Sequence, residues 1–423
     1  MTISESEPRD SYIVATYRIS SYLPLEKAAE ILAGEQSSGT FTRVALESED
    51  LKRRHGAVVS RITVDETPIA PLPGSWRPSP AATLTTGTVE VLFPTINFGP
   101  SVASLITTVA GNLYELRELA AVKLLDVELP AALAQHYSGP LRGIPGTRRL
   151  MGVDGGAMIG TIVKPSIGLH LEQLTALVRE LALAGIDFIK DDELNTDPPF
   201  APLNQRIDAV MRVLNDVADQ TGKLTMYAFN VTGDVDSMKM GLERIERQGG
   251  TCAMAAIPTI GFSALAELRK STDLALHGHR AGFGALDRHP GLGMSFRVFQ
   301  KLARVCGADH LHVGGIDSKF WEDNSAVVSS VRAMQRPLEI GNPMLPVLSS
   351  AQTAATAATT HALIQSADIL VLAGGGIHAH PGGASAGVSS MRAAWDAVVA
   401  GDVPEEVAEP GSPLDIALKA FGH

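Results

Sequence analysis

The densest group of residues that could do chemistry lies at the end of an apolar run that reaches Lys190. Three carboxylates, Asp191, Asp192 and Glu193, follow the lysine with no spacer. Side chains on a β-strand alternate between its faces, so Lys190 and Asp192 are expected to point one way and Asp191 the other. Glu193 lies where the strand should end, so alternation no longer sets its direction.

Two interpretations of this cluster are open. The lysine can form an ordinary ion pair with its neighbours, and acidic residues at strand ends often cap the next helix. Alternatively, its amine combines with carbon dioxide to give a carbamate, which is an anionic oxygen ligand. Lys190, Asp192 and Glu193 would then present three hard oxygens to one Mg²⁺ ion, which keeps water or substrate in its other positions.

Other reactive or polar groups also follow apolar runs. They are Lys164 and Ser166; Asn230; His277, His279 and Arg280; His310, His312 and Lys319; Ser349 and Ser350; and Gly374, Gly375 and Gly376. Lys164 is either a surface lysine or a buried, reactive amine. His277 and His279 share a strand face, and so do His310 and His312, of which one is expected to be structural. The three glycines leave N–H groups open to an anion, although tight turns use glycine equally.

These groups stand at the ends of regularly spaced segments. Runs typical of strands lie at 158–163, 186–190, 224–230, 251–256, 274–277, 310–313, 345–348 and 369–372. Amphipathic helices lie between them, for example at 171–184, 204–221 and 235–248. Residues 140–423 are therefore predicted to form a (β/α)₈ barrel, whose active site lies at the carboxyl ends of its strands. Amines, imidazoles, an arginine, clustered carboxylates and a glycine-rich turn at those ends suit a phosphorylated, oxygen-rich substrate on a hard cation.

Residues 11–135 have a different order of elements. Strands are predicted at 11–20, 41–46, 57–64, 89–98 and 120–129, with helices at 25–33 and 101–112. This order predicts an α+β, ferredoxin-like domain, with an open antiparallel sheet and helices on one face. Five prolines within 68–80 indicate an irregular connection, and residues 1–10 are expected to be disordered. Glu35, Thr40 and Asn112 lie at loops or helix ends, where capping is a sufficient explanation.

Composition narrows the class of protein. A chain of 423 residues with 45% hydrophobic residues can bury a large core. A net charge of −11 without any basic run argues against a nucleic-acid partner. Cys252 and Cys306 lie far apart in the sequence, so we expect two buried thiols in a reducing compartment. The polar, acidic N-terminus is unlike a signal peptide, and no apolar run is long enough for a membrane span, so we expect a cytoplasmic protein.

The motifs, in their order, resemble those of the large chain of ribulose-bisphosphate carboxylase (RuBisCO), and the resemblance covers nearly the whole chain. The segment 185–193 resembles the metal motif of that family. The resemblance implies a carbamylated Lys190 that binds Mg²⁺ together with Asp192 and Glu193. Lys164 matches the lysine that transfers a proton near the enediolate, and Lys319 stands where the family has its mobile-loop lysine.

The resemblance also implies substrate-binding residues. His279 and Arg280 match a histidine–arginine pair of the family, while His312 and Ser349 match residues around one phosphate site. Gly374 and Gly375 match the backbone of the other phosphate site. The family positions of Glu35, Thr40 and Asn112 reach the barrel of the neighbouring subunit, which implies a homodimer with shared sites.

The chain departs from the carboxylase pattern at several positions. Ser166 replaces a lysine, Phe283 a histidine and Phe41 a tryptophan. Ala351 replaces a glycine in the turn at 349–352, which suggests a substrate with one phosphate. The segment around Lys319 lacks the glycines and the acidic partner of the carboxylase loop. These departures indicate a RuBisCO-like protein of the non-photosynthetic type (form IV) that does not fix carbon.

Three functions follow from this resemblance. The leading hypothesis is a Mg²⁺-dependent enzyme of sugar-acid catabolism that acts on 3-oxo-isoapionate 4-phosphate, by decarboxylation or by transcarboxylation with hydrolysis. The second is an enolase or isomerase of methionine salvage that acts on a methylthio-pentulose phosphate, with Phe283, Phe320 and Trp321 around the thioether. The third is a non-catalytic binding protein on the same scaffold, which would have no affinity for Mg²⁺.

Overall fold

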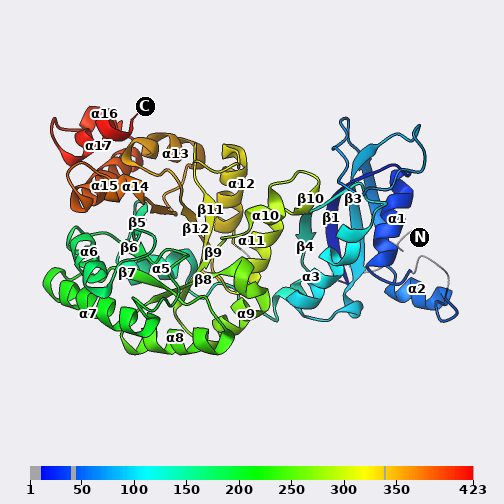
Figure 1. Ribbon diagram of the computed structural model, residues 1–423, viewed down its shortest axis with the longest axis horizontal. Coiled ribbons are helices and arrows are strands. Elements are labelled where there is room, and N and C mark those ends of the chain that lie inside the picture. The colour runs from blue at the N-terminus through cyan, green and yellow to red at the C-terminus, as the bar shows by residue number, and fades with distance from the viewer. Residues whose placement is uncertain (1–10, 40–43, 338–339, 423) are drawn as a thin grey trace. The chain divides into compact units, whose positions relative to one another are not determined.

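Figure 1 shows a computed structural model of the chain, which describes residues 11–39, 44–337 and 340–422. The chain divides into two compact units. The first takes in the residues up to Tyr137 together with 282–302, and the second takes in 138–281 and the residues from 303 onward. The predicted disorder of residues 1–10 concerns positions outside the described residues.

The first unit is built on a five-stranded sheet in the order β10-β4-β1-β3-β2. Its strands are β1 (Tyr12–Ser21), β2 (Val58–Val64), β3 (Thr85–Pro94), β4 (Ala121–Glu128) and β10 (Leu292–Met294). β1 pairs antiparallel with β3 and β4, and β2 pairs antiparallel with β3, so the predicted antiparallel sheet is confirmed. β10 comes from far along the sequence and adds a parallel strand to β4.

The short elements of this unit differ from the prediction. Its helices are α1 (Leu25–Glu35), α2 (Glu49–His55), α3 (Val102–Ala110), α4 (Ala131–Ala134) and α10 (Gly284–Asp287), with 3₁₀ turns η2 (Thr95–Asn97) and η3 (Asn112–Glu115). The strand predicted at 41–46 is wrong in its described part, because 44–46 form a turn. α2 follows instead, capped by the Ser48 hydroxyl, which accepts from the Leu51 N–H at 3.1 Å. None of its residues is buried, so it carried no apolar pattern by which to predict it.

The second unit is a closed barrel of eight parallel strands, and all eight predicted strands are confirmed within a few residues. In barrel order they are β5 (Met158–Ile162), β6 (Phe188–Lys190), β7 (Met226–Asn230), β8 (Cys252–Ala256), β9 (Ala275–His279), β11 (His310–Gly314), β12 (Leu345–Leu348) and β13 (Leu370–Leu372). Nearly every strand residue is buried, because one face packs in the barrel interior and the other against helices.

Helices of the second unit follow the strands. They are α5 (Gly143–Met151), α6 (Leu171–Leu183), α7 (Leu203–Thr221), α8 (Val235–Arg247), α9 (Ile257–Ser271), α12 (Asn324–Gln335), α13 (Ala357–Ile364), α14 (Gly375–His378), α15 (Ala384–Ala400), α16 (Pro404–Val407) and α17 (Pro413–Phe421), with a 3₁₀ turn η4 (Ala354–Thr356). α11 (Phe296–Val305) begins among residues of the first unit and ends in the second. In Figure 1, α6, α7 and α8 follow one another around the outside of the barrel. Among the described residues, no helix is long and apolar enough to span a membrane.

A cluster of buried apolar side chains fills the interior of the barrel, and both cysteines of the chain are buried. Phe188, Met226, Met254 and Val347 belong to one buried cluster that also takes in residues of α5. Cys252 lies in this cluster, and burial raises the pKa of its thiol well above the usual value. Burial also raises the pKa of the Cys306 thiol, to about 12. Both thiols are free and buried, as predicted, and are therefore protonated and unreactive.

Candidate active site

The candidate cluster at the end of β6 consists of Lys190, Asp192 and Glu193, with the Lys164 amine beside them. The Lys190 side chain is 0% exposed, and its amine lies 3.7 Å from a Glu193 oxygen, beyond hydrogen-bond distance. Among the described residues, the Lys190 amine has no hydrogen-bond partner. Beside it, the Lys164 amine donates to Asp192 Oδ2 and to Ser166 Oγ, both at 2.7 Å.

The surroundings lower the pKa of both Lys190 and Asp192. Burial lowers the pKa of the Lys190 amine, although the charges of Glu193 and Asp192 act in the opposite direction. Burial alone would raise the pKa of Asp192, but hydrogen bonds from the Lys164 amine and the Leu194 N–H outweigh it and leave that pKa lowered. Only the neutral amine carries the lone pair that attacks carbon dioxide, so a lowered pKa of Lys190 favours carbamylation.

The cluster fits a magnesium ion if Lys190 carries a carbamate. Nowhere in the described parts of the chain do three or more His, Cys, Asp or Glu side chains come together in a way that could hold a metal. Asp192 and Glu193 supply two carboxylates, and Mg²⁺ prefers oxygen ligands. A carbamate on Lys190 would add the third oxygen ligand. It would also give a hydrogen-bonding role to a buried amine that otherwise has none.

The outward face of β6 holds this strand end in place. Asp191 accepts hydrogen bonds from Arg206 Nε at 3.1 Å, from the Tyr227 hydroxyl at 2.7 Å and from the Asn230 N–H at 2.9 Å. The Asn230 side-chain amide donates to the carbonyls of Asp192 and Glu193, at 3.2 and 3.1 Å. The alternation expected from the sequence therefore places Asp191 in a supporting role behind Asp192.

Arg206 is a supporting residue that the sequence did not reveal. It lies on α7, is 0% exposed, and donates to the carbonyls of Asn195 at 3.2 Å, Thr196 at 2.5 Å and Ala201 at 2.7 Å. It therefore ties the segment that follows the carboxylates to Asp191. The available signal was an arginine next to the apolar residues of an amphipathic helix, a place where a charge needs a buried partner.

His279 faces the cluster from the end of β9. Its Nε2 lies 3.5 Å from the same Glu193 oxygen, and its Nδ1 accepts the Ala281 N–H at 3.2 Å. Burial, together with the positive charges of Lys190 and Arg280, lowers the pKa of His279 well below its usual value. A neutral ring that accepts at Nδ1 carries its proton on Nε2, so His279 presents an N–H to Glu193 and to the space beside it.

Three further histidines form a hydrogen-bonded line through the barrel, here called the histidine chain (His310, His277 and His312). The line runs from Thr147 Oγ1 to His310 Nε2 at 2.7 Å, and from His310 to His277 through their Nδ1 atoms at 3.3 Å. It continues from His277 Nε2 to His312 Nε2 at 2.8 Å, and from His312 Nδ1 to Ser349 Oγ at 2.9 Å.

All three rings of the histidine chain are buried, and burial lowers the pKa of each of them, in the case of His310 to about 3. Both ring nitrogens of His312 are used inside this line, so in this arrangement neither is directed at a substrate. The Ser349 hydroxyl, at the end of β12, is the group that the histidine chain presents to the carboxyl face of the barrel.

Arg280 lies next to His279 and is already paired. Its Nη1 donates to Glu322 Oε1 at 2.7 Å, and its Nη2 contacts Glu322 Oε2. Glu322 lies in the irregular segment after β11. In the same segment Lys319 is exposed, and its amine lies 5.9 Å from the centroid of the Phe320 ring. Within the described residues, the structure therefore does not bring Lys319 to the Lys190 cluster.

The two predicted phosphate turns keep unusual backbones. After β12, Ser350 and Ala351 have φ angles of 78° and 54°, in the left-handed region that favours glycine. The turn thus has a glycine-like backbone although glycine is absent. After β13, a Cβ on Gly374 would lie 3.7 Å from the Lys164 Cε, whereas one on Gly375 would meet nothing within 4 Å. The backbone of Gly374 therefore lies against Lys164, and open space begins at Gly375.

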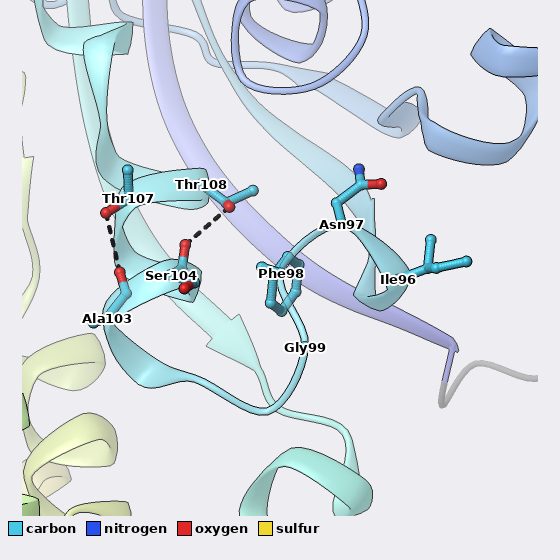
Figure 2. A pocket seen from close by; sticks show the side chains of 8 residues that line it. All are labelled: Ile96, Asn97, Phe98, Gly99, Ala103, Ser104, Thr107 and Thr108. Atoms are coloured by element: carbon cyan, nitrogen blue, oxygen red, sulfur yellow. Dashed lines mark hydrogen bonds between the residues drawn. The ribbon is translucent and has the colours of Figure 1, made fainter.

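Glu35, Thr40 and Asn112, the predicted site residues from the N-terminal region, belong to the first unit. Glu35 is the last residue of α1, and Asn112 begins η3, whereas Thr40 and Phe41 lie outside the described residues. A hollow of about 520 Å³ in the same unit is lined by residues 96–99 and by residues of α3. Figure 2 shows the side chains that line it, among them Thr107 and Thr108, whose hydroxyls donate to helix carbonyls. Neither Glu35 nor Asn112 is among the lining residues.

A parallel (β/α)₈ barrel with an amine, two carboxylates and a neutral histidine at the carboxyl ends of its strands is typical of enzymes that stabilise anionic oxygen intermediates. Two family models match the chain. Residues 143–421 match the catalytic domain of the ribulose bisphosphate carboxylase large chain, and residues 3–133 match its N-terminal domain. The chain therefore belongs to the RuBisCO large-chain family.

Curated relatives and solved structures agree with this assignment. A 3-oxo-isoapionate-4-phosphate transcarboxylase/hydrolase of Xanthobacter autotrophicus is 46% identical, covering 96% of this chain and 98% of its own. A 3-oxo-isoapionate-4-phosphate decarboxylase of Rhizobium etli is 40% identical, covering 93% and 95%. The crystal structure of a rubisco-like protein from Burkholderia fungorum is 40% identical, covers 97% of this chain and 100% of its own, and has a TM-score of 0.90. The chain is thus similar to enzymes of the RuBisCO-like branch.

Oligomeric structures also occur among its relatives. A dimeric archaeal Rubisco from Hyperthermus butylicus has a TM-score of 0.86 at 27% identity, and covers 99% of this chain and 97% of its own.

Proposed function

We propose that the protein acts on 3-oxo-isoapionate 4-phosphate or a closely similar phosphorylated 3-oxo sugar acid, by decarboxylation or by transcarboxylation with hydrolysis. The observation that carries the proposal is the cluster at the end of β6, where the buried Lys190 amine has no hydrogen-bond partner within the described parts of the chain and lies 3.7 Å from Glu193. The names of the two curated relatives supply the substrate.

The cluster would hold Mg²⁺ through a carbamate on Lys190 and through Asp192 and Glu193. Bound there, the ion would supply Lewis-acid stabilisation of negative charge on two substrate oxygens. In a decarboxylation, the bond between the carboxylate and the adjacent carbon breaks, carbon dioxide leaves, and the electron pair forms an enolate. The Lys164 amine donates to Asp192 Oδ2, and its stem lies against Gly374 next to the open space at Gly375, so Lys164 would protonate that carbon.

The other residues in the proposal would bind the substrate and orient it. The Nε2–H of His279 and the Ser349 hydroxyl would donate to substrate oxygens, and the backbone of Gly374 and Gly375 would accept the phosphate. We also propose that Arg280 and His312 bind the substrate. In this structure Arg280 is paired with Glu322, and His312 is hydrogen-bonded to His277 and Ser349.

Two parts of the proposal concern the assembly. We propose a homodimer with shared sites, in which Glu35, Thr40 and Asn112 of one protomer would complete the barrel site of the other. The oligomeric solved relatives are the support for it. We also keep a cytoplasmic location and the absence of a nucleic-acid partner, for which the support is the acidic composition.

The second candidate is the methionine-salvage enolase or isomerase. One observation favours it, because Phe320 and Trp321 are 46% and 45% exposed and could cover a thioether. Phe283 does not belong with them. It is 2% exposed and packs against Phe296 and Phe299, with ring centroids 5.3 and 4.7 Å apart. The idea that Phe283 lines the substrate pocket is therefore wrong.

The test is a coupled assay of the purified protein with Mg²⁺ and bicarbonate. The two substrates are 3-oxo-isoapionate 4-phosphate and 5-methylthioribulose 1-phosphate. Release of carbon dioxide or glycolate from the first supports the proposal, and turnover of the second alone overturns it. Lys190→Ala should abolish the Mg²⁺-dependent activity while the protein remains folded. Lys239→Ala, which removes an amine of α8 that is paired with Glu267 of α9, is the control.

A further inference from the structure

The guanidinium of Arg280 is held by a carboxylate of this chain, that of Glu322. Arg280 stands at the end of β9, and both oxygens of Glu322 meet its guanidinium fork. The side chains are 13% and 8% exposed, so water screens the pair little. A bidentate carboxylate on an arginine has the geometry that a phosphate oxygen pair adopts on the same group.

The backbone under this pair is shaped to receive it. Gly314, the last residue of β11, has a φ of 92°, and a Cβ there would lie 3.1 Å from Arg280 Nη2 and 3.2 Å from Glu322 Oε2. The carbonyl of Gly314 accepts the Ser349 N–H at 2.9 Å. The pair thus lies over neighbouring strand ends, beside the Ser349 hydroxyl at the carboxyl face of the barrel.

Glu322 also belongs to the segment that carries Lys319, Phe320 and Trp321. Asp323, the next residue, caps α12 by accepting the Ala326 N–H at 2.8 Å. This cap fixes the start of α12 directly after Glu322. If Glu322 moves, the irregular residues before it must therefore move with it. Those residues carry the three exposed side chains.

We propose that Glu322 is an internal competitor for the substrate anion and sets the affinity and specificity of the site. An incoming phosphate takes the place of the Glu322 carboxylate on Arg280. The released carboxylate moves away, because two anions cannot share one guanidinium without strong repulsion. The segment 317–322 then shifts, so that anion binding is coupled to the positions of Trp321 and Lys319. The inference rests on the proposed function, in which the substrate carries a phosphate.

The affinity test uses inorganic phosphate and sulfate, titrated into the purified full-length protein by calorimetry. Glu322→Gln keeps the size of the side chain and removes its charge, so phosphate affinity should rise by about tenfold or more. Asp317→Asn removes the same charge from the same segment, where Asp317 is paired with Asn324, and should change the affinity less than about twofold. Adding Arg280→Met to Glu322→Gln should abolish the gain. An unchanged or weaker affinity in folded Glu322→Gln overturns the proposal.

The wild-type protein tests the coupling without any change at Glu322. Phosphate should alter the fluorescence of Trp321, and Trp321→Phe should remove that signal while two tryptophans remain. Phosphate binding seen by calorimetry with no change in Trp321 overturns the displacement of Glu322. Substrate turnover is assayed separately. If the sugar acid is not turned over but the Glu322→Gln gain is found, the proposed function fails and the competition stands.

Discussion

Replacing Lys190 with methionine should make the protein more stable when no carbon dioxide or Mg²⁺ is present. Methionine is nearly as long as lysine and apolar, and it would occupy the same buried space. The wild-type amine is 0% exposed and, among the described residues, has no hydrogen-bond partner. The substitution therefore removes a buried polar group that the folded chain leaves unsatisfied.

The sign of the effect follows from two opposing contributions. An ammonium 3.7 Å from a carboxylate gains on the order of 4 kcal/mol at an effective dielectric constant of about 20, but Glu193 is 35% exposed and solvent reduces that gain. Desolvation is the larger effect, because the pKa of Lys190 is lowered by burial despite the carboxylates. An unsatisfied buried donor costs about 1–3 kcal/mol, so the free energy of unfolding should rise by about that amount in Lys190→Met.

The dependence on pH has a definite sign. The folded-state pKa of Lys190 lies below the value of 10.5 for an unperturbed lysine, so the folded state binds fewer protons than the unfolded state. The penalty in the wild type is therefore fully present below the folded-state pKa and disappears as the pH rises towards 10.5. The advantage of Lys190→Met should shrink over the same range.

The measurement is thermal unfolding in carbon-dioxide-free buffer with a chelator. A gain of 1 kcal/mol shifts Tm by about 2–4 °C in a domain of 150–250 residues. Lys239→Met, which removes an amine paired with Glu267, should show no gain. Adding Mg²⁺ and bicarbonate should raise the Tm of the wild type by ligand binding and leave Lys190→Met unchanged. A loss of about 1 kcal/mol or more in Lys190→Met would refute the reasoning, because the amine would then have a stabilising partner.

Two further predictions concern the supports of the site. Arg206→Met should lower the free energy of unfolding by about 3–5 kcal/mol, because it leaves Asp191 buried without its cation. Chemical denaturation measures this loss, and adding Asp191→Asn should recover part of it; no recovery would mean that the two side chains do not act as a pair. The histidine chain should make stability fall as the pH drops from 6.5 to 5, by up to about 1.4 kcal/mol per pH unit for each neutral ring, because the folded-state pKa values lie below those of the unfolded chain. A flat profile of Tm over that range would contradict the buried, neutral state of these rings.

Local pattern was sufficient for the barrel and for the direction of the side chains along β6. Eight apolar runs between amphipathic helices specify a (β/α)₈ barrel, because burial of parallel strands on both faces requires that pattern. The alternation of side chains along β6 separated Asp191 from Lys190 and Asp192 before any contact was known. The strand at 41–46 failed, and α2 was missed, because short exposed segments carry no periodic signal.

The sequence by itself determined which strand ends carry reactive groups, since chain order and strand period place them there. Tertiary structure alone decided how those groups pair. Arg206 reaches Asp191 from another element, Glu322 covers Arg280 from a different loop, and both nitrogens of His312 are used within the histidine chain. These contacts join residues that are distant in sequence, and burial rather than local pattern sets whether a charge or a proton is retained there.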